Sequence, residues 1–284
     1  MQLARFRTPA GDLHVGRVDG DHVVDLTGTA GIGSSVRTLL ADLPTLRPAI
    51  AAATGKSYAL ADVEFLAPVD APQKFLGIGM NYRAHAAEAL QAGIPTPTSQ
   101  LWFNKQVSCI AGPYDDIVKP GVSEEMDYEI ELGVVIGTRC RHVAREDARE
   151  VVAGYVVVND VSVRDWLAKR SPTFTLGKSF DTHGPFGPWL TTDDEVADPH
   201  DLALRLWVNG EERQNARTND MIYDVYDQIA YLTTVMTLEP GDVLATGTPS
   251  GIGAPTGAFL RPGDVVRGEI DGLGVIENRV VAES

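Results

Sequence analysis

The chain has 284 residues, 44% of them hydrophobic and 22% charged, and its formal net charge is −15 at pH 7. This is the composition of a soluble globular protein with one or two domains. The excess of acidic residues, with no compensating cluster of lysine and arginine, argues against nucleic acid or an anionic membrane surface as a partner. A small anionic substrate stays possible if a metal ion and a few cationic side chains reverse the local field.

Two cysteines, Cys109 and Cys140, provide neither a disulfide framework nor the spacing of a zinc site. The first 17 residues lack the apolar core of a signal peptide. No run approaches the ~18 apolar residues that a membrane-spanning helix needs. We therefore expect a cytoplasmic protein with no membrane partner.

Residues 1–70 are expected to form a small β-rich domain, and residues 71–284 a larger second domain. Leucine spacing in Ser35–Ala53 predicts one or two short helices. Prolines at positions 68 and 72 mark the boundary. Glycine and aspartate turns separate three predicted strands, at residues 2–6, 13–18 and 22–26.

The second part is predicted to contain many short strands separated by glycine and proline turns. Apolar residues recur every three or four positions in Met221–Thr237, which predicts an amphipathic helix capped by Asp220. A shorter helix is expected to start at Tyr82. The pattern lacks strand–helix alternation, so we predict an α+β, predominantly β fold with mostly antiparallel or mixed sheets. The predicted strands are residues 75–78, 101–104, 130–136, 153–158, 189–192, 203–208, 243–246, 265–270 and 274–281.

Three acidic residues are the strongest candidates for a functional site. Glu129 and Glu131 lie two apart in a predicted strand over residues 126–136, so they should share one face, with Ile130 on the other. Asp160 ends a second predicted strand, residues 154–160. Close carboxylates repel unless a cation lies between them, and three oxygen ligands favour Mg²⁺, then Mn²⁺ or Ca²⁺. The alternative is a solvated acidic face, but the apolar runs that flank these residues indicate buried strands.

Three further segments carry candidate chemistry, each with a structural alternative. His85 and Glu88 lie one helical turn apart, as a water-activating pair or as an ordinary surface pair. Lys178 follows a glycine but lacks the first glycine of a P-loop, so it either polarises a carbonyl or is a solvated loop lysine. Thr246–Gly253 offers N–H groups and hydroxyls for a carboxylate, or is simply a tight turn.

Taken together, five segments resemble the fumarylacetoacetate hydrolase family. They are Gly79–Glu88, Tyr128–Gly133, Asn159–Asp165, Gly177–Asp181 and Thr246–Gly251, in the order of the family motifs. The resemblance covers about residues 74–281. It implies a fumarylacetoacetate-hydrolase-like mixed β-roll with a small N-terminal β-rich domain, a catalytic domain over residues 71–284, a homodimer, and Mg²⁺ as cofactor.

The resemblance also implies roles for individual residues. Glu129, Glu131 and Asp160 take the metal-ligand role, and His85 with Glu88 the water-activating role. Lys178 takes the carbonyl-polarising role. Arg83, Gly247 and Thr248 take substrate-binding roles, and the segment from Leu90 to Gln100 resembles a mobile lid.

The implied activity is metal-dependent hydrolysis of a C–C bond in a 2,4-dioxo acid, such as an acylpyruvate, a sugar-acid relative or a ring-cleavage product. The metal would hold the 2-oxo acid, and water activated by His85 would attack the C4 carbonyl to release pyruvate or a similar 2-oxo acid. Oxaloacetate decarboxylation and 2-hydroxy-dienoate isomerisation use the same enolate chemistry and stay open. A non-catalytic metal-binding module and a phosphoryl-transfer enzyme are weaker alternatives.

Overall fold

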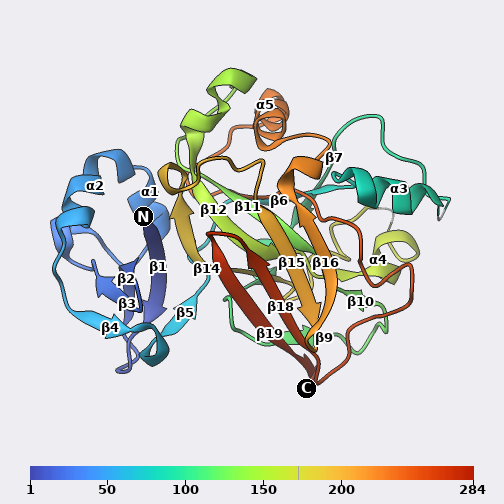
Figure 1. The fold of residues 1–284 in the computed structure, drawn as a ribbon, viewed down its shortest axis with the longest axis horizontal. Helices are drawn as coiled ribbons and strands as arrows, with labels where there is room; N and C mark the ends of the chain where they lie inside the picture. Colours follow the sequence, from blue (N-terminus) through green and yellow to red (C-terminus); the bar gives the residue numbers. More distant parts are fainter. Residues whose placement is uncertain (92, 172) are drawn as a thin grey trace.

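The computed structural model describes residues 1–91, 93–171 and 173–284, so the predicted lid segment is described except for residue 92. The N-terminal segment contains the three predicted strands and two short helices, which confirms that part of the prediction (Figure 1). Two further strands follow the helices. The elements are β1 (Gln2–Arg7), β2 (Leu13–Asp19), β3 (His22–Asp25), α1 (Val36–Leu40), α2 (Leu43–Ala52), β4 (Ser57–Ala59) and β5 (Glu64–Leu66).

A 12-stranded mixed sheet runs through the molecule, and its path is β4-β3-β2-β1-β14-β12-β11-β17-β6-β7, with β5 and β8 beside it. Because β1 pairs with β14, the N-terminal strands continue the main sheet. The domain division at residue 70 stays a prediction. The main-sheet strands are β6 (Phe75–Gly79), β7 (Leu101–Lys105), β8 (Ile110–Ala111), β11 (Ile130–Ile136), β12 (Val152–Asn159), β14 (Gly184–Thr192) and β17 (Val243–Ala245).

A second sheet of five strands, in the order β16-β15-β18-β19-β9, packs against the first. Most pairs in both sheets are antiparallel, and β17–β6, β14–β8 and β19–β9 are parallel. The predominantly β, mixed-sheet prediction is therefore confirmed. The remaining strands are β9 (Ile117–Lys119), β10 (Met126–Asp127), β13 (Ser162–Val163), β15 (Ala203–Val208), β16 (Glu211–Arg217), β18 (Val265–Ile270) and β19 (Gly274–Ala282).

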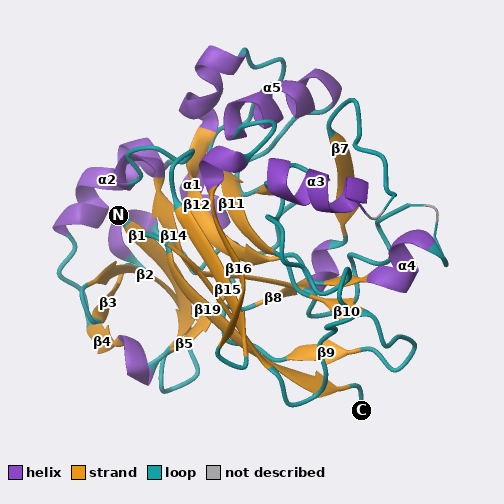
Figure 2. Ribbon diagram, turned by 45° about the vertical axis from the view of Figure 1, so that its right-hand side comes forward, coloured by secondary structure: helices purple, strands orange, loops and turns teal. Residues whose placement is uncertain are grey.

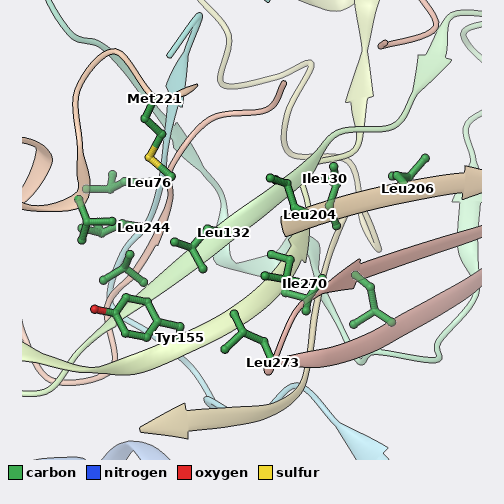
Figure 3. Packing of buried hydrophobic residues seen from close by; sticks show 14 of the residues in the cluster. Leu76, Ile130, Leu132, Tyr155, Leu204, Leu206, Met221, Leu244, Ile270 and Leu273 are labelled. Carbon is green, nitrogen blue, oxygen red and sulfur yellow. The ribbon is translucent and has the colours of Figure 1, made fainter. Parts of the chain in front are cut away.

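Alternate residues of β11 enter two different cores. Ile130 and Leu132 pack into the space between the two sheets, near Leu204 and Ile270 (Figure 3). Glu131 and Val135 point the other way, and Val135 joins the core that includes the N-terminal helices. This confirms the prediction that Ile130 faces away from Glu131. A carboxylate is thus fixed on a strand that is apolar on both sides.

The helices lie outside the two sheets, and α1 and α2 cover one face of the main sheet (Figure 2). The long C-terminal helix α5 runs from Val225 to Val235, and Asp224 caps it in a reciprocal pair with Asp227. The predicted start at Met221 and the predicted cap Asp220 are therefore wrong. Asp220 instead accepts a hydrogen bond from the Ala84 N–H at the start of another helix. The other helices of this part are α3 (Arg83–Gln91) and α4 (Arg164–Ala168).

Short 3₁₀ turns connect several of these elements. They are Thr29–Gly31, Leu60–Asp62, Val107–Cys109, Arg145–Val151, Asp193–Glu195 and Thr218–Asp220. Among the residues that the structure describes, no helix has both the length and the apolar character needed to cross a membrane.

Candidate metal centre

Glu129, Glu131 and Asp160 come together in the structure as a buried carboxylate triad. One oxygen from each lies within 4.8 Å of the others, and the residues are 5%, 1% and 0% exposed. The solvated-face alternative is therefore wrong. The predicted strand over residues 126–136 is interrupted, because Glu129 lies between β10 and β11. The Asp160 N–H donates to the Glu129 carbonyl at 2.8 Å, which joins the ends of the two segments.

Two buried lysines neutralise part of this triad. Lys178 Nζ donates to Glu129 Oε2 and to Asp160 Oδ2, both at 2.7 Å. Lys105, at the end of β7, donates to Asp160 Oδ1 at 2.6 Å, to the Val161 carbonyl at 3.4 Å and to the Lys178 carbonyl. Lys178 is therefore not the solvated loop lysine that was one alternative.

The two lysines differ in how many N–H donors they have left. An ammonium group has three. Lys105 uses all three within the protein, whereas Lys178 uses two. Only Lys178 therefore has a donor available for a bound molecule without breaking an existing contact.

Arg164, the first residue of α4, supports the triad from the other side. Its Nη2 lies 2.7 Å from Glu129 Oε1, and its Nε donates to Asp127 Oδ2 at 2.8 Å. Asp127 is fully buried and also accepts from the N–H groups of Gly253 and Ala254. This carboxylate thus anchors the 246–254 loop to β10, which ends two residues before Glu129.

The electrostatics of the three carboxylates are unequal. Burial alone would raise the pKa of Glu129, but Lys178 and Arg164, with a smaller contribution from His85, lower it to about 2. Burial, together with Asp160 and Glu129, raises the pKa of Glu131 well above its ordinary value, against the opposing effect of Lys178. Glu131 accepts one hydrogen bond from the described residues, from the Gly247 N–H at 2.7 Å. It is the member of the triad with the least compensated charge.

The donor set fits a hard divalent ion. Oxygen atoms on opposite sides of such an ion are separated by roughly 4 to 5 Å, which the spacing of the triad allows. Each carboxylate oxygen of Glu129 and Asp160 already contacts a cationic side chain, but a carboxylate oxygen has more than one lone pair. The undercompensated Glu131 supplies the charge that a bound ion would neutralise.

His85 and Glu88 form the predicted pair on α3. Nδ1 of His85 lies 3.1 Å from Glu88 Oε2, and the two side chains are 12% and 28% exposed. A ring oriented in this way by a carboxylate presents its Nε2 as the second nitrogen. The pair is partly shielded, unlike the exposed His22–Asp21 pair elsewhere on the chain.

The 246–248 loop serves the triad more directly than predicted. The Gly247 N–H donates to Glu131, and the hydroxyls of Thr246 and Thr248 donate to the carbonyls of Leu132 and Ile130 at 2.9 Å. Gly247 has φ 101°, and a Cβ there would lie 2.7 Å from the Asn81 side chain, so only glycine fits. The hydroxyl proton of Thr248 is thus already used, but no described residue accepts from its main-chain N–H.

Arg83 lies away from these contacts. Its side chain is exposed, and its Nη1 donates to the Asn219 carbonyl at 3.2 Å. Its predicted role in substrate binding stays a prediction.

Four polar residues that organise the site were not predicted from the sequence: the buried Lys105, Asp127 and Gln214, and the partly buried Arg164. Gln214 accepts from the Ile130 N–H and donates to Thr248 Oγ1 at 2.8 Å, so it connects β11 to the loop. A lysine at the end of a strand that begins with three apolar residues, and an arginine four residues after Asp160, were the available signals. Gln214 left no such signal, because its strand is polar throughout.

Comparisons with known proteins place the chain in a family of enzymes. The family described as fumarylacetoacetate (FAA) hydrolase, C-terminal, matches residues 74–281, and the family described as Rv2993c-like, N-terminal, matches residues 1–68. The chain therefore belongs to the fumarylacetoacetate hydrolase family.

Three relatives show the range of chemistry in the family. The chain is 37% identical to maleylpyruvate hydrolase from Sphingobium sp. SYK-6, whose structure contains manganese(II) and pyruvate, with a TM-score of 0.86 and all of both chains covered. It is 33% identical to 2-hydroxyhepta-2,4-diene-1,7-dioate isomerase from Mycobacterium marinum, with a TM-score of 0.80, 100% of this chain and 99% of the other covered. It is 44% identical to the mitochondrial oxaloacetate tautomerase FAHD2B of Homo sapiens, covering 89% of this chain and 77% of the other.

Proposed function

We propose that the protein is a divalent-metal-dependent hydrolase that cleaves the C3–C4 bond of a 2,4-dioxo acid and releases pyruvate or a similar 2-oxo acid. The observation that carries this proposal is the buried triad of Glu129, Glu131 and Asp160, with Lys178 bonded to two of its members. A 2-oxo acid offers two oxygen ligands to a hard ion. The hydrolase relative with manganese(II) and pyruvate supports the same chemistry.

In the proposed mechanism, Glu129, Glu131 and Asp160 would hold an ion, which would supply Lewis acidity toward the oxygens of the 2-oxo acid. Lys178 has one N–H donor beyond its two carboxylate bonds, and this donor serves the oxygen on which enolate charge develops. The main-chain N–H of Thr248 binds the substrate carboxylate, and Arg83 and Gly247 belong to the substrate-binding residues. Gly247 contributes by holding Glu131 in place.

His85 is the general base of the proposed reaction. With Nδ1–H donated to Glu88, Nε2 accepts a proton from water. The water oxygen forms a bond to C4, the C3–C4 bond breaks, and its electron pair stays with C3. The proton held by His85 is then available for C3, so the products are a carboxylic acid and a 2-oxo acid.

A second candidate is proton transfer or decarboxylation without an attacking water. The 44% identity to an oxaloacetate tautomerase and the 33% identity to a hydroxy-dienoate isomerase favour it. The same triad and Lys178 would stabilise the enolate of oxaloacetate or of a 2-hydroxy-dienoate. What distinguishes the two candidates is whether His85 activates water.

The experiment is a side-by-side assay of an acylpyruvate, oxaloacetate and a 2-hydroxy-dienoate, each with Mg²⁺ and with EDTA. Hydrolysis of the acylpyruvate that EDTA abolishes supports the first candidate. Turnover of oxaloacetate or the dienoate alone supports the second. Full activity in EDTA, or turnover of none of them, would refute a metal-dependent enzyme of this kind.

We further propose Mg²⁺ as the ion, with Mn²⁺ or Ca²⁺ as alternatives, a homodimer, and a cytoplasmic location. Elemental analysis of protein purified without added metal tests the ion. Light scattering coupled to size-exclusion chromatography tests the dimer.

A further inference from the structure

The triad is flanked by one face of β7, the strand at the edge of the main sheet. Leu101, Phe103 and Lys105 alternate along β7 and therefore share this face. Lys105 reaches Asp160, and the Lys178 ammonium lies 4.9 Å from the centre of the Phe103 ring. This face changes from charged at Lys105 to aromatic at Phe103 and aliphatic at Leu101.

The neighbouring strand β6 has glycines, Gly77 and Gly79, beside these side chains. A Cβ on Gly77 would lie 2.5 Å from the Phe103 ring, so this ring packs directly on the backbone of β6. Beyond it, the atoms nearest to where a Cβ of Gly79 would be belong to Leu101 and Phe174, at 3.4 and 3.5 Å. β6 therefore adds no side chain that could fill the space beside Leu101.

A cavity of about 390 Å³ opens along the outer edge of β7, where residues from both faces of the strand line it. The Phe174 ring meets the Phe103 ring edge to face, with 5.8 Å between centres, and forms one wall. None of the described residues that line the cavity is charged; they are Leu101, Trp102, Phe103, Asn104, Thr173, Phe174 and Thr175. The cavity and the triad share Phe103 as a boundary, since Lys178 lies over that ring.

Helix α3, which carries His85 and Glu88, starts four residues after β6 ends. In both ribbon views α3, β7 and α4 gather on the same side of the molecule (Figures 1 and 2). A substrate whose 2-oxo acid end is held at the triad would have its acyl group beyond C4 near this side. The cavity is the apolar space that can take it.

Charge decides which acyl group fits. The three cationic side chains next to the triad, Lys105, Lys178 and Arg164, are already paired with carboxylates. A second carboxylate at the far end of the substrate would lie against Phe103 and Phe174 with no cation among the described lining residues, and would lose part of its hydration without a compensating charge. A phenyl or alkyl group would instead bury apolar surface.

We propose that this cavity is the acyl-group pocket, and that the protein acts on 2,4-dioxo acids with an uncharged, apolar acyl group in preference to those with a distal carboxylate. The inference rests on the proposed hydrolase function. It separates this chain from substrates such as maleylpyruvate and 2-hydroxyhepta-2,4-diene-1,7-dioate, both of which carry a second carboxylate.

The test compares kcat/KM of the Mg²⁺-loaded enzyme for acetylpyruvate, benzoylpyruvate and maleylpyruvate. We expect benzoylpyruvate to exceed maleylpyruvate by about tenfold or more. Phe174→Ala should lower kcat/KM for benzoylpyruvate about tenfold and leave acetylpyruvate within about threefold. Tyr231→Ala, which removes a surface aromatic on α5 that is 41% exposed, is the matched control and should change neither.

A second variant tests the charge argument in the opposite direction. Asn104→Lys places a cation at an exposed position in the cavity lining, and should raise kcat/KM for maleylpyruvate relative to benzoylpyruvate by about tenfold. Two results would overturn the pocket assignment alone. In the first, kcat/KM for maleylpyruvate equals or exceeds kcat/KM for benzoylpyruvate. In the second, Phe174→Ala lowers kcat/KM equally for all three substrates. No hydrolysis of any of the three would overturn the proposed function and the pocket assignment with it.

Discussion

Replacing Glu131 with glutamine should change metal affinity and metal-free stability in opposite directions. Glu131→Gln keeps the shape of the side chain and an oxygen that can accept from the Gly247 N–H. It removes a carboxylate that is 1% exposed and whose pKa is raised by burial and by Asp160 and Glu129. The change therefore removes a metal ligand and also a source of repulsion in the metal-free protein.

The size of the stabilisation follows from linkage. An acid whose pKa is raised on folding contributes stability below its unfolded pKa, and this contribution is lost as pH rises toward the folded pKa. At pH 7 this loss of stability is at most the free energy needed to keep Glu131 protonated in the folded state, relative to an unfolded pKa of about 4.3, which is ~3 to 4 kcal/mol. Metal-free Glu131→Gln should thus be more stable than the metal-free wild type at pH 7, by up to that amount.

Metal affinity should fall at least about 100-fold, because two carboxylates that already contact three cations chelate a divalent ion poorly. Urea unfolding in EDTA measures the first effect, and calorimetric titration with Mn²⁺ the second. Asn104→Asp, an acid–amide exchange at an exposed position outside the triad, is the control. Unchanged Mn²⁺ affinity, or a metal-free variant less stable than the metal-free wild type, would refute this account of the triad.

Three other predictions address neighbouring residues. His85→Ala should reduce acylpyruvate hydrolysis about 100-fold or more and spare oxaloacetate decarboxylation, because only hydrolysis needs an activated water. The control His22→Ala, at an exposed histidine, should affect neither activity. Equal loss of both activities in His85→Ala would exclude His85 as the base that activates water. Lys178→Met should lower kcat at saturating Mn²⁺ about 100-fold. Lys105→Met should mainly lower the free energy of unfolding, by ~3 to 5 kcal/mol, because all three N–H donors of Lys105 bond within the protein. Similar losses of kcat in the two variants would contradict this difference between the lysines. Burial lowers the pKa of His183 to about 4, so the free energy of unfolding should decrease by up to ~3 kcal/mol as the pH falls from about 6.5 to 4. Urea unfolding at several pH values measures this decrease, and His183→Gln should make it smaller. An unchanged pH dependence in this variant would exclude His183 as the cause.

Short apolar runs bounded by turn residues were enough to predict most strands and to single out the three acidic residues as a candidate site. The strand from Ile130 to Ile136 is buried on both faces, as the continuous apolar run from Leu132 to Ile136 indicates, and the strand geometry places Glu131 on the face opposite Ile130. The predicted strand that ends at Asp160 marked this residue as the third candidate, and the order of the family motifs gave it the same metal-ligand role as Glu129 and Glu131. The break at Glu129 was not predictable, because it depends on the pairing of β10 with β13, a contact distant in sequence.

The α5 cap was mispredicted for a related reason. Asp220 and Asp224 are both good capping residues, and the apolar spacing extends back to Ile222. The main-chain N–H of Ile222 instead donates to Asn81, and that of Tyr223 to the Asn81 side chain, which holds this stretch in an extended contact with the turn before α3. A tertiary contact therefore overrides a local helix preference.

The buried charges around the triad account for how an acidic protein can bind an anion. Asp127, Glu129, Glu131 and Asp160 face Lys105, Arg164 and Lys178, which leaves one excess negative charge. In the metal-free protein the raised pKa of Glu131 lets a proton cancel that charge. A divalent ion that displaces this proton leaves one excess positive charge, which matches the single carboxylate of a 2-oxo acid. Metal affinity should therefore rise with pH, and substrate should bind only after the metal.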